Sequence, residues 1–296
     1  MLPNFFVVGA QKSATTSLHH YLEKHPEIYL PKQKETHFFV RDEAYKLGVE
    51  YYEDTYFSNW NGQARIGEVD PEYMYFPIAL ERIKEHIDLS GLKVVFVFRN
   101  PVDRAFSHYQ MSVKRAIEKV SFEDAISYED ERLKSGSYEK EHFSYVARGE
   151  YYDQVLPFLD LLGEENILYL LTEDLRDNRN ETLKKIYKFL GVDSSYVSED
   201  VEKNFHKASL SKYVSLTEFI KGNGKYSFKF VRVVLKLIVP SLALRNKIKN
   251  ILLSLNSKPS DLSLEAETQD KLKSHFKEYN KKLSVLISRD LSCWNK

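Results

Sequence analysis

The sequence FFVVGAQKSATTS, residues 5–17, contains the two features from which the fold is inferred. Its first five residues form a continuous apolar run, which is typical of a strand buried on both faces. The polar stretch that follows leads into a helical pattern in which Leu18, Tyr21 and Leu22 share one face. A buried strand that turns directly into a helix is the opening unit of a parallel α/β sheet.

Similar signals recur along the chain. Short apolar runs predict further strands at 66–69, 93–98 and 167–171. Helical patterns stand between the strands, at 17–24, 101–119, 121–134, 151–162 and 181–190. From about residue 216 onward the chain reads as entirely helical. We therefore expect an α/β fold with a P-loop-like central parallel sheet flanked by helices, in a single domain over 1–296 whose C-terminal region, about 211–296, is helical.

Composition and charge limit the classes of protein to which this chain can belong. The chain has 296 residues, 43% of them hydrophobic and 29% charged, which is a globular composition. Its 43 basic and 43 acidic residues give zero net charge, so we expect no nucleic-acid partner. The single cysteine, Cys293, permits no intrachain disulfide, and no signal peptide or membrane-spanning run is evident, so we expect a cytoplasmic protein. The nine histidines show no zinc-ligand spacing, and we expect no metal.

The loop after the first strand, residues 9–16, is rich in groups that bind anions. The turn into the helix gathers backbone N–H groups at the positive end of a helix dipole, and Lys12 adds a full charge. Hydroxyl donors are also supplied, by Ser13, Thr15, Thr16 and Ser17. A phosphate or sulfate group suits this loop. Because Gln11 and not glycine precedes Lys12, the loop is not a Walker A motif; the alternative is a threonine-capped helix beside a solvated lysine.

A second basic turn follows the strand predicted at 93–98. Asn100 is a good N-cap and Pro101 a good first helical residue, so Arg99 is expected at the carboxyl end of a parallel strand, where open α/β sheets bind ligands. Ser107 lies about two turns into the following helix, and its hydroxyl and the Arg99 guanidinium suit one phosphate. The alternative is that Arg99 only pairs with Asp103 or another carboxylate.

Taken together, the two basic turns resemble sulfotransferases that use 3′-phosphoadenosine-5′-phosphosulfate (PAPS), above all the heparan sulfate N- and 3-O-sulfotransferase branch and its bacterial relatives. Other motifs of that family follow in the correct order: Lys34-Glu35-Thr36-His37-Phe38-Phe39, Arg148-Gly149-Glu150-Tyr151, Glu173-Asp174-Leu175, Phe189-Leu190-Gly191, Asn280-Lys281-Lys282-Leu283 and Asp290-Leu291-Ser292-Cys293-Trp294. Each motif alone is weakly specific, whereas their order is strongly so.

The resemblance implies PAPS as the sulfate donor, no metal, and a set of donor-binding residues: Gln11, Lys12, Ser13, Ala14, Thr15, Thr16, Ser17, Arg99, Ser107 and Tyr151. It also implies Glu35 as general base for an acceptor hydroxyl, with Lys12 stabilising the leaving phosphate and His37 assisting. If the segment is extended, Glu35 and His37 share a face. The alternatives are a surface carboxylate paired with Lys32 or Lys34, and a structural histidine.

Two departures from the family pattern stand out. Val69 occupies a position where the family usually has lysine, so one positive charge is absent there or is supplied by Lys32 or Lys34. The family's C-terminal Lys-Gly-Arg loop is also not evident, and residues 204–209 are the candidate replacement.

The resemblance implies sulfuryl transfer from PAPS to a hydroxyl or amine of a small-molecule or glycan acceptor, such as a carbohydrate or glycolipid. The alternatives are an inactive relative that binds anionic glycans or membranes, and a P-loop phosphotransferase. The acceptor itself and the oligomeric state do not follow from the sequence.

The segment 219–260 is strongly basic. It contains nine lysines and arginines and no acidic residue, and Lys225, Lys229, Arg232 and Lys236 fall on one helical face. Such a helix suits the inner face of an anionic membrane or an anionic acceptor. The alternative is a core-packed helix whose basic face is only solvated, or which balances the acidic remainder of the chain.

Overall fold

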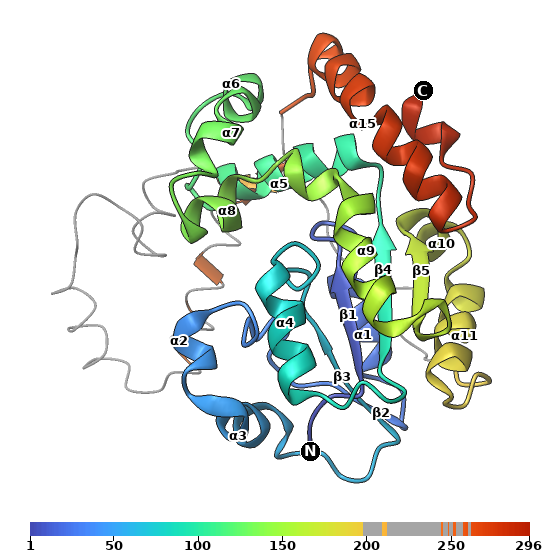
Figure 1. Ribbon diagram of the computed structural model, residues 1–296. Helices are drawn as coiled ribbons and strands as arrows, with labels where there is room; N and C mark the ends of the chain where they lie inside the picture. The colour runs from blue at the N-terminus through green and yellow to red at the C-terminus, as the bar shows by residue number, and fades with distance from the viewer. Residues whose placement is uncertain (198–208, 212–243, 245–247, 249–250, 253–256, 260–261) are drawn as a thin grey trace, which may run out of the picture. The chain divides into compact units, whose positions relative to one another are not determined.

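A computed structural model describes residues 1–197, 209–211, 244, 248, 251–252, 257–259 and 262–296 (Figure 1). The chain forms two compact units, one made of residues 1–104, 146–205 and 270–296 and the other of residues 105–145 and 206–269. The basic segment 219–260, with Lys225, Lys229, Arg232 and Lys236, lies outside the described residues except for the few positions given above. So do residues 204–208.

A five-stranded parallel sheet forms the centre of the first unit. The strands stand in the order β2-β3-β1-β4-β5 (Figure 1). Their bounds are β1 Phe5–Gly9, β2 Ile28–Tyr29, β3 Arg65–Val69, β4 Lys93–Phe98 and β5 Ile167–Leu171. The predicted strands are confirmed, and in this sheet β2 alone was missed, because two residues are too few to show a pattern.

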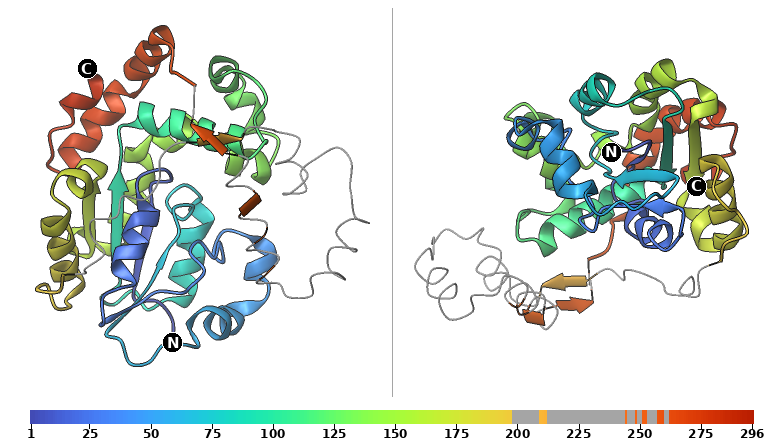
Figure 2. Two further views of the ribbon diagram at one scale, coloured as in Figure 1. Left: turned by 180° about the vertical axis from the view of Figure 1, so that it is seen from behind. Right: turned by 90° about the horizontal axis from the view of Figure 1, so that it is seen from below.

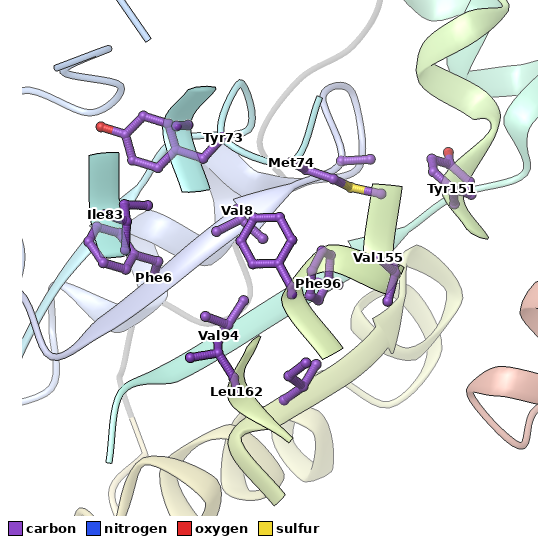
Figure 3. Packing of buried hydrophobic residues seen from close by; sticks show 14 of the residues in the cluster. Phe6, Val8, Tyr73, Met74, Ile83, Val94, Phe96, Tyr151, Val155 and Leu162 are labelled. Atoms are coloured by element: carbon purple, nitrogen blue, oxygen red, sulfur yellow. The ribbon is translucent and has the colours of Figure 1, made fainter. Parts of the chain in front are cut away.

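Helices cover both faces of the sheet, as the continuous apolar strands predicted. Side chains alternate between the faces, so Phe6, Val94 and Phe96 contribute to one core cluster while Phe5 and Val95 contribute to the other. The first cluster packs against α4 (Pro77–His86) and α9 (Tyr151–Leu162), and Figure 3 shows Ile83, Val155 and Leu162 of these helices beside it. The second packs against α1 (Thr15–Leu22) and α11 (Arg179–Leu190), on the side seen from behind in Figure 2.

Shorter elements complete the described chain of the first unit. They are α2 Asp42–Tyr45, α3 Gly48–Tyr52, a π-helical turn Glu53–Phe57, α10 Thr172–Asp177 and single 3₁₀ turns at Ala147–Gly149, Glu164–Asn166 and Ser292–Asn295. The C-terminal helix α15 (Ala266–Leu286) brings the chain end back to the first unit, where Trp294 is buried in the same cluster as Tyr151. Trp294 Nε1 donates to Glu173 Oε1 at 3.1 Å, and Arg289 pairs with Asp174 at 2.8 Å.

The second unit contains most of α5 (Pro101–Lys114), together with α6 Phe122–Ser127, α7 Glu129–Arg132 and α8 Ser137–Phe143. Helix α5 ends five residues earlier than predicted, because Ala116 takes the left-handed conformation at φ 59°. There the Ile117 N–H donates to Ser112 O at 2.9 Å and the Ala116 N–H to Val113 O at 2.9 Å, which is a Schellman motif. The single helix predicted at 121–134 is divided into α6 and α7.

The described part of the C-terminal region is mainly helical, as expected, but it also contains strand. β6 (Ser209–Ser211) and β7 (Ser257–Pro259) form a two-stranded antiparallel sheet. Pro259 explains why residues 257–259 are not helical, since proline disfavours the helical conformation of the residue before it and cannot donate a backbone hydrogen bond. Among the described residues, no helix combines the length and apolar character that a membrane span requires.

The register of β1 against β3 predicts one sensitive position. Phe5 pairs with Gly67, and a Cβ added at Gly67 would lie 2.1 Å from the Phe5 ring. We expect Gly67→Ala to lower the free energy of unfolding by roughly 1–3 kcal/mol, because a well-packed core resists an added methyl group. Chemical denaturation measures this change, and the double variant Gly67→Ala, Phe5→Leu should recover part of it. A Gly67→Ala protein as stable as wild type contradicts the assigned register.

Candidate functional site

The carboxyl ends of β1, β3 and β4 bring three loops to one edge of the sheet, because these strands are parallel neighbours. Direct hydrogen bonds connect the loops. Gln11 Nε2 donates to Glu72 Oε1 at 2.9 Å, which joins the β1 and β3 loops. Arg99 Nη1 donates to Lys12 O at 3.2 Å, which joins the β4 and β1 loops. Gln11, Lys12 and Arg99, which were predicted from separate parts of the sequence, are therefore neighbours at this edge.

The loop between β1 and α1 has the backbone of an anion-binding nest. Lys12 and Ala14 have positive φ values, 70° and 62°, at alternate positions. Such alternation turns successive N–H groups toward one point. The N-cap of α1 is Ala14, and no side chain of that residue caps the helix. The alternative interpretation, a threonine-capped helix, is therefore wrong, and the first N–H groups of α1 lack an intrahelical acceptor.

Arg99 stands directly after β4, as predicted. Asn100 caps the following helix, because its Oδ1 accepts the Val102 N–H at 3.0 Å. The Tyr151 phenol, at the start of α9, donates to Arg99 O at 2.9 Å. Tyr151 is only 1% exposed, and burial raises its pKa to about 12 although Arg104, Arg99 and Ser13 oppose the rise. Tyr151 therefore fixes the backbone of the Arg99 turn from the buried core.

Ser107 lies on α5 in the second unit. Its role beside Arg99 stays a prediction from the sequence.

Glu72 and Arg148 form a buried ion pair that the sequence did not reveal as part of the site. Arg148 Nη2 lies 2.6 Å from Glu72 Oε2, and the two side chains are 2% and 6% exposed. The guanidinium also lies 4.3 Å from the Tyr75 ring centroid. Because the other Glu72 oxygen accepts from Gln11, this pair anchors the anion-binding loop. The signal available in the sequence was Arg148 in a family motif, which did not identify its partner.

Arg104 is a second buried charged residue near the site that was not predicted from the sequence. It is fully buried one turn into α5 and lies close enough to Tyr151 to lower the pKa of that phenol. The one feature of the sequence that could have placed Arg104 near the site is its position three residues before Ser107, on the same helical face.

The segment that holds Glu35 and His37 is tied to the end of β3. The Glu35 N–H donates to Val69 O at 3.3 Å, and the Thr36 N–H to Glu68 Oε1 at 3.0 Å. Glu35 and His37 have φ values of 62° and 55°, so the segment is not extended and the condition for the two side chains to share one face is not met. These left-handed residues let the backbone turn toward the carboxylates of β3.

Glu35 and His37 have different partners. The Glu35 carboxylate pairs with the Lys34 ammonium, as one alternative interpretation predicted, and its side chain is 35% exposed. His37 Nδ1 lies 3.1 Å from Asp70 Oδ2. Burial lowers the pKa of His37, but the hydrogen bond and charge of Asp70, with the charge of Glu72, raise it to about 9. His37 is therefore a cation at neutral pH.

The Val69 side chain does not face the anion-binding groups of the β1 and β4 loops. Its side chain is 1% exposed and packs in the second core cluster with Leu18 and Leu22 of α1. Lys34 is engaged by Glu35. Lys32 is exposed.

Comparison with known proteins identifies the family to which the chain belongs. The family described as sulfotransferase domain matches residues 2–224. The chain belongs to this family. A sulfotransferase of known structure from Alicyclobacillus acidocaldarius shares 26% identity over the full length of both chains, with a TM-score of 0.71.

Two curated relatives are similar over part of the sequence. The membrane-associated sulfotransferase kil1 of Dictyostelium discoideum is 36% identical over 115 residues, which is 38% of this chain and 24% of the relative. Heparan sulfate glucosamine 3-O-sulfotransferase 3B1 of Mus musculus is 27% identical over 191 residues, 64% of this chain and 46% of the relative. The chain thus spans between about a quarter and a half of the length of these sulfotransferases.

No cluster of three or more His, Cys, Asp or Glu side chains in the described residues is arranged to hold a metal ion. The groups at the edge of the sheet are instead suited to anions. Lys12, Arg99 and the N-terminus of α1 supply positive charge and N–H donors, and Glu35 supplies an accessible carboxylate.

Glu68 predicts how stability depends on pH. Burial and the charge of Asp70 raise the pKa of Glu68 to about 7. The folded protein therefore keeps a proton that the unfolded chain releases near pH 4.5, and stability falls as pH rises from 4.5 to 7. We expect the melting temperature of wild type, relative to that of Glu68→Gln, to decrease between pH 5 and 7 and to level off above that range. A constant difference between the two proteins across this range contradicts the raised pKa.

Proposed function

We propose that this protein transfers a sulfuryl group from PAPS to a hydroxyl or amine of an acceptor, which we take to be a carbohydrate or glycolipid. The main support for the proposal is that two basic turns are hydrogen-bonded to each other. Lys12 and Ala14 form a nest before α1, and the Arg99 side chain donates a hydrogen bond to the backbone of that nest. Membership of the sulfotransferase family supports the same assignment. The names of the heparan sulfate relatives support a carbohydrate acceptor.

In the proposed complex the loop from Gln11 to Ser17 binds the 5′-phosphosulfate. Lys12 and the N–H groups of α1 stabilise the negative charge that develops on the phosphate oxygen as its bond to sulfur breaks. Arg99 and Ser107 bind the 3′-phosphate, and Tyr151 supports Arg99 from the core. Glu72 and Arg148 hold the loop in place through Gln11.

On the acceptor side, Glu35 is the proposed general base and His37 assists. Glu35 takes the proton of the acceptor hydroxyl while the acceptor oxygen attacks the sulfur atom in line with the departing phosphate. The new bond joins acceptor oxygen to sulfur, and the products are the sulfated acceptor and adenosine 3′,5′-bisphosphate. The reaction resembles phosphoryl transfer, since positioning and electrostatic stabilisation supply most of the rate.

Donor binding tests the first half of this proposal. We expect adenosine 3′,5′-bisphosphate to bind without magnesium in isothermal titration calorimetry, and ATP to bind weakly with or without it. Arg99→Ala should weaken bisphosphate binding by about 1.5–3 kcal/mol, the contribution of a charge-assisted hydrogen bond. Arg176→Ala is the matched control, because Arg176 is 70% exposed and pairs only with its neighbour Asp177. Equal affinities of Arg99→Ala and wild type would refute the assignment of Arg99.

The catalytic step is tested with two further variants. Glu35→Gln keeps the shape of the side chain but removes the base, so turnover should fall by about 10² or more while bisphosphate affinity stays near that of wild type. Lys12→Ala should also lower turnover, because the variant cannot stabilise the negative charge that develops on the leaving phosphate. The controls are Glu43→Gln and Lys24→Ala, since both residues are exposed. Normal turnover of Glu35→Gln would show that another residue is the base.

A further inference from the structure

Asp70 makes contact with both the backbone and the ring of His37. Its Oδ2 accepts the His37 N–H at 2.8 Å and lies 3.1 Å from His37 Nδ1. Its Oδ1 accepts the Glu72 N–H at 3.1 Å. The side chain is 0% exposed, and both oxygens are therefore fixed. A buried carboxylate beside Nδ1 favours the doubly protonated imidazolium ring.

The orientation of the His37 ring leaves its other nitrogen for a ligand. Nδ1 is buried against Asp70, whereas the side chain as a whole is 18% exposed. No described residue makes a hydrogen bond with Nε2, and this atom is not among the buried ones. The His37 backbone N–H holds Asp70 Oδ2 in place, and a turn of the ring would take Nδ1 away from that oxygen. His37 thus presents one fixed N–H two residues after Glu35.

The other groups around His37 shift its pKa in opposite directions. Glu72 raises the pKa of His37, while Arg41 and burial lower it. Glu68 is the second buried carboxyl group beside Asp70, and its own pKa is raised to about 7 by burial and by the charge of Asp70. Burial also raises the pKa of Tyr52 and Tyr73, so these phenols remain protonated and donate to Glu68. The negative charge that faces His37 most closely is therefore that of Asp70.

We propose that Asp70 is a positioning residue that holds His37 as a cation, so that His37 acts in the transfer as a fixed N–H donor and never as a proton acceptor. This inference rests on the proposed function. It leaves Glu35 as the single proton acceptor of the reaction, and it gives the site a positive charge from the 34–37 segment that does not depend on Lys34, which is engaged by Glu35. The role of Asp70 is exerted through His37, not by contact with the substrate.

The variant Asp70→Asn tests the proposal through the pH dependence of turnover. In wild type, turnover should persist to about pH 9, where His37 loses its proton. In Asp70→Asn the alkaline limit should move to about pH 6.5, the ordinary pKa of histidine. We expect activity near wild type at pH 6 and about 30-fold lower at pH 8, with bisphosphate affinity unchanged. A merely structural role of Asp70 would lower activity by one factor at every pH, and that result would overturn the proposal.

A measurement on the wild-type protein keeps the proposal testable if Asp70→Asn does not fold. NMR titration of the histidine ring nuclei, with His37→Gln to identify the signal, reports the charge of His37 directly. We expect the ring to remain protonated at pH 7.5; a neutral ring at that pH would overturn the proposal. Glu118→Gln is a control for Asp70→Asn, since Glu118 is a buried carboxylate in the second unit that pairs with Arg132 and not with a histidine.

Failure of this inference is distinguishable from failure of the proposed function. If the protein does not bind adenosine 3′,5′-bisphosphate, the proposed function fails, whatever the charge of His37. If the nucleotide binds and transfer occurs but the alkaline limit of Asp70→Asn is unchanged, only the role assigned to Asp70 fails.

Discussion

The parallel alignment of β1 between β3 and β4 is the constraint on which the site depends. The carboxyl ends of all three strands lie at one edge of the sheet. The turns that directly follow Gly9, Val69 and Phe98 are therefore neighbours. The strands are held by two core clusters, one on each face of the sheet. A rigid frame of this kind lets loops with unusual backbone conformations carry the chemistry, because the buried strands supply the stability that the loops do not.

Three polar contacts, of which the Glu72–Arg148 pair is fully buried, fix the positions of the loops relative to one another. Glu72 binds Gln11 on one side and Arg148 on the other, and Arg99 binds the backbone of Lys12. Each contact joins segments far apart in the sequence, so each loop is positioned by its neighbours as well as by its own strand. Buried ion pairs add little net stability, but loss of one partner is costly. Their value here is in positioning, since the anion-binding loop and the acceptor-side segment are anchored to the same end of β3.

Much of the frame was predictable from the sequence, because apolar strands such as 93–98 carry a strong local signal and Asn100-Pro101 marks a helix start. The anion-binding loop was recognised for a similar reason. Long-range polar pairing was not predictable: nothing near Arg148 in the sequence points to Glu72, and nothing near His37 points to Asp70. The left-handed backbone of Glu35 and His37 was also missed, since non-glycine residues seldom adopt it and the local sequence gives no warning.

The central claim is that the edge formed by the β1 and β4 loops holds the nucleotide of a sulfate donor. A crystal structure of the protein with adenosine 3′,5′-bisphosphate tests it most directly. We expect the 5′-phosphate at the N-terminus of α1, with Lys12 Nζ and the loop N–H groups as donors, and the 3′-phosphate on the Arg99 guanidinium. A nucleotide bound elsewhere on the protein, with Lys12 and Arg99 both free of phosphate contacts, would contradict the account.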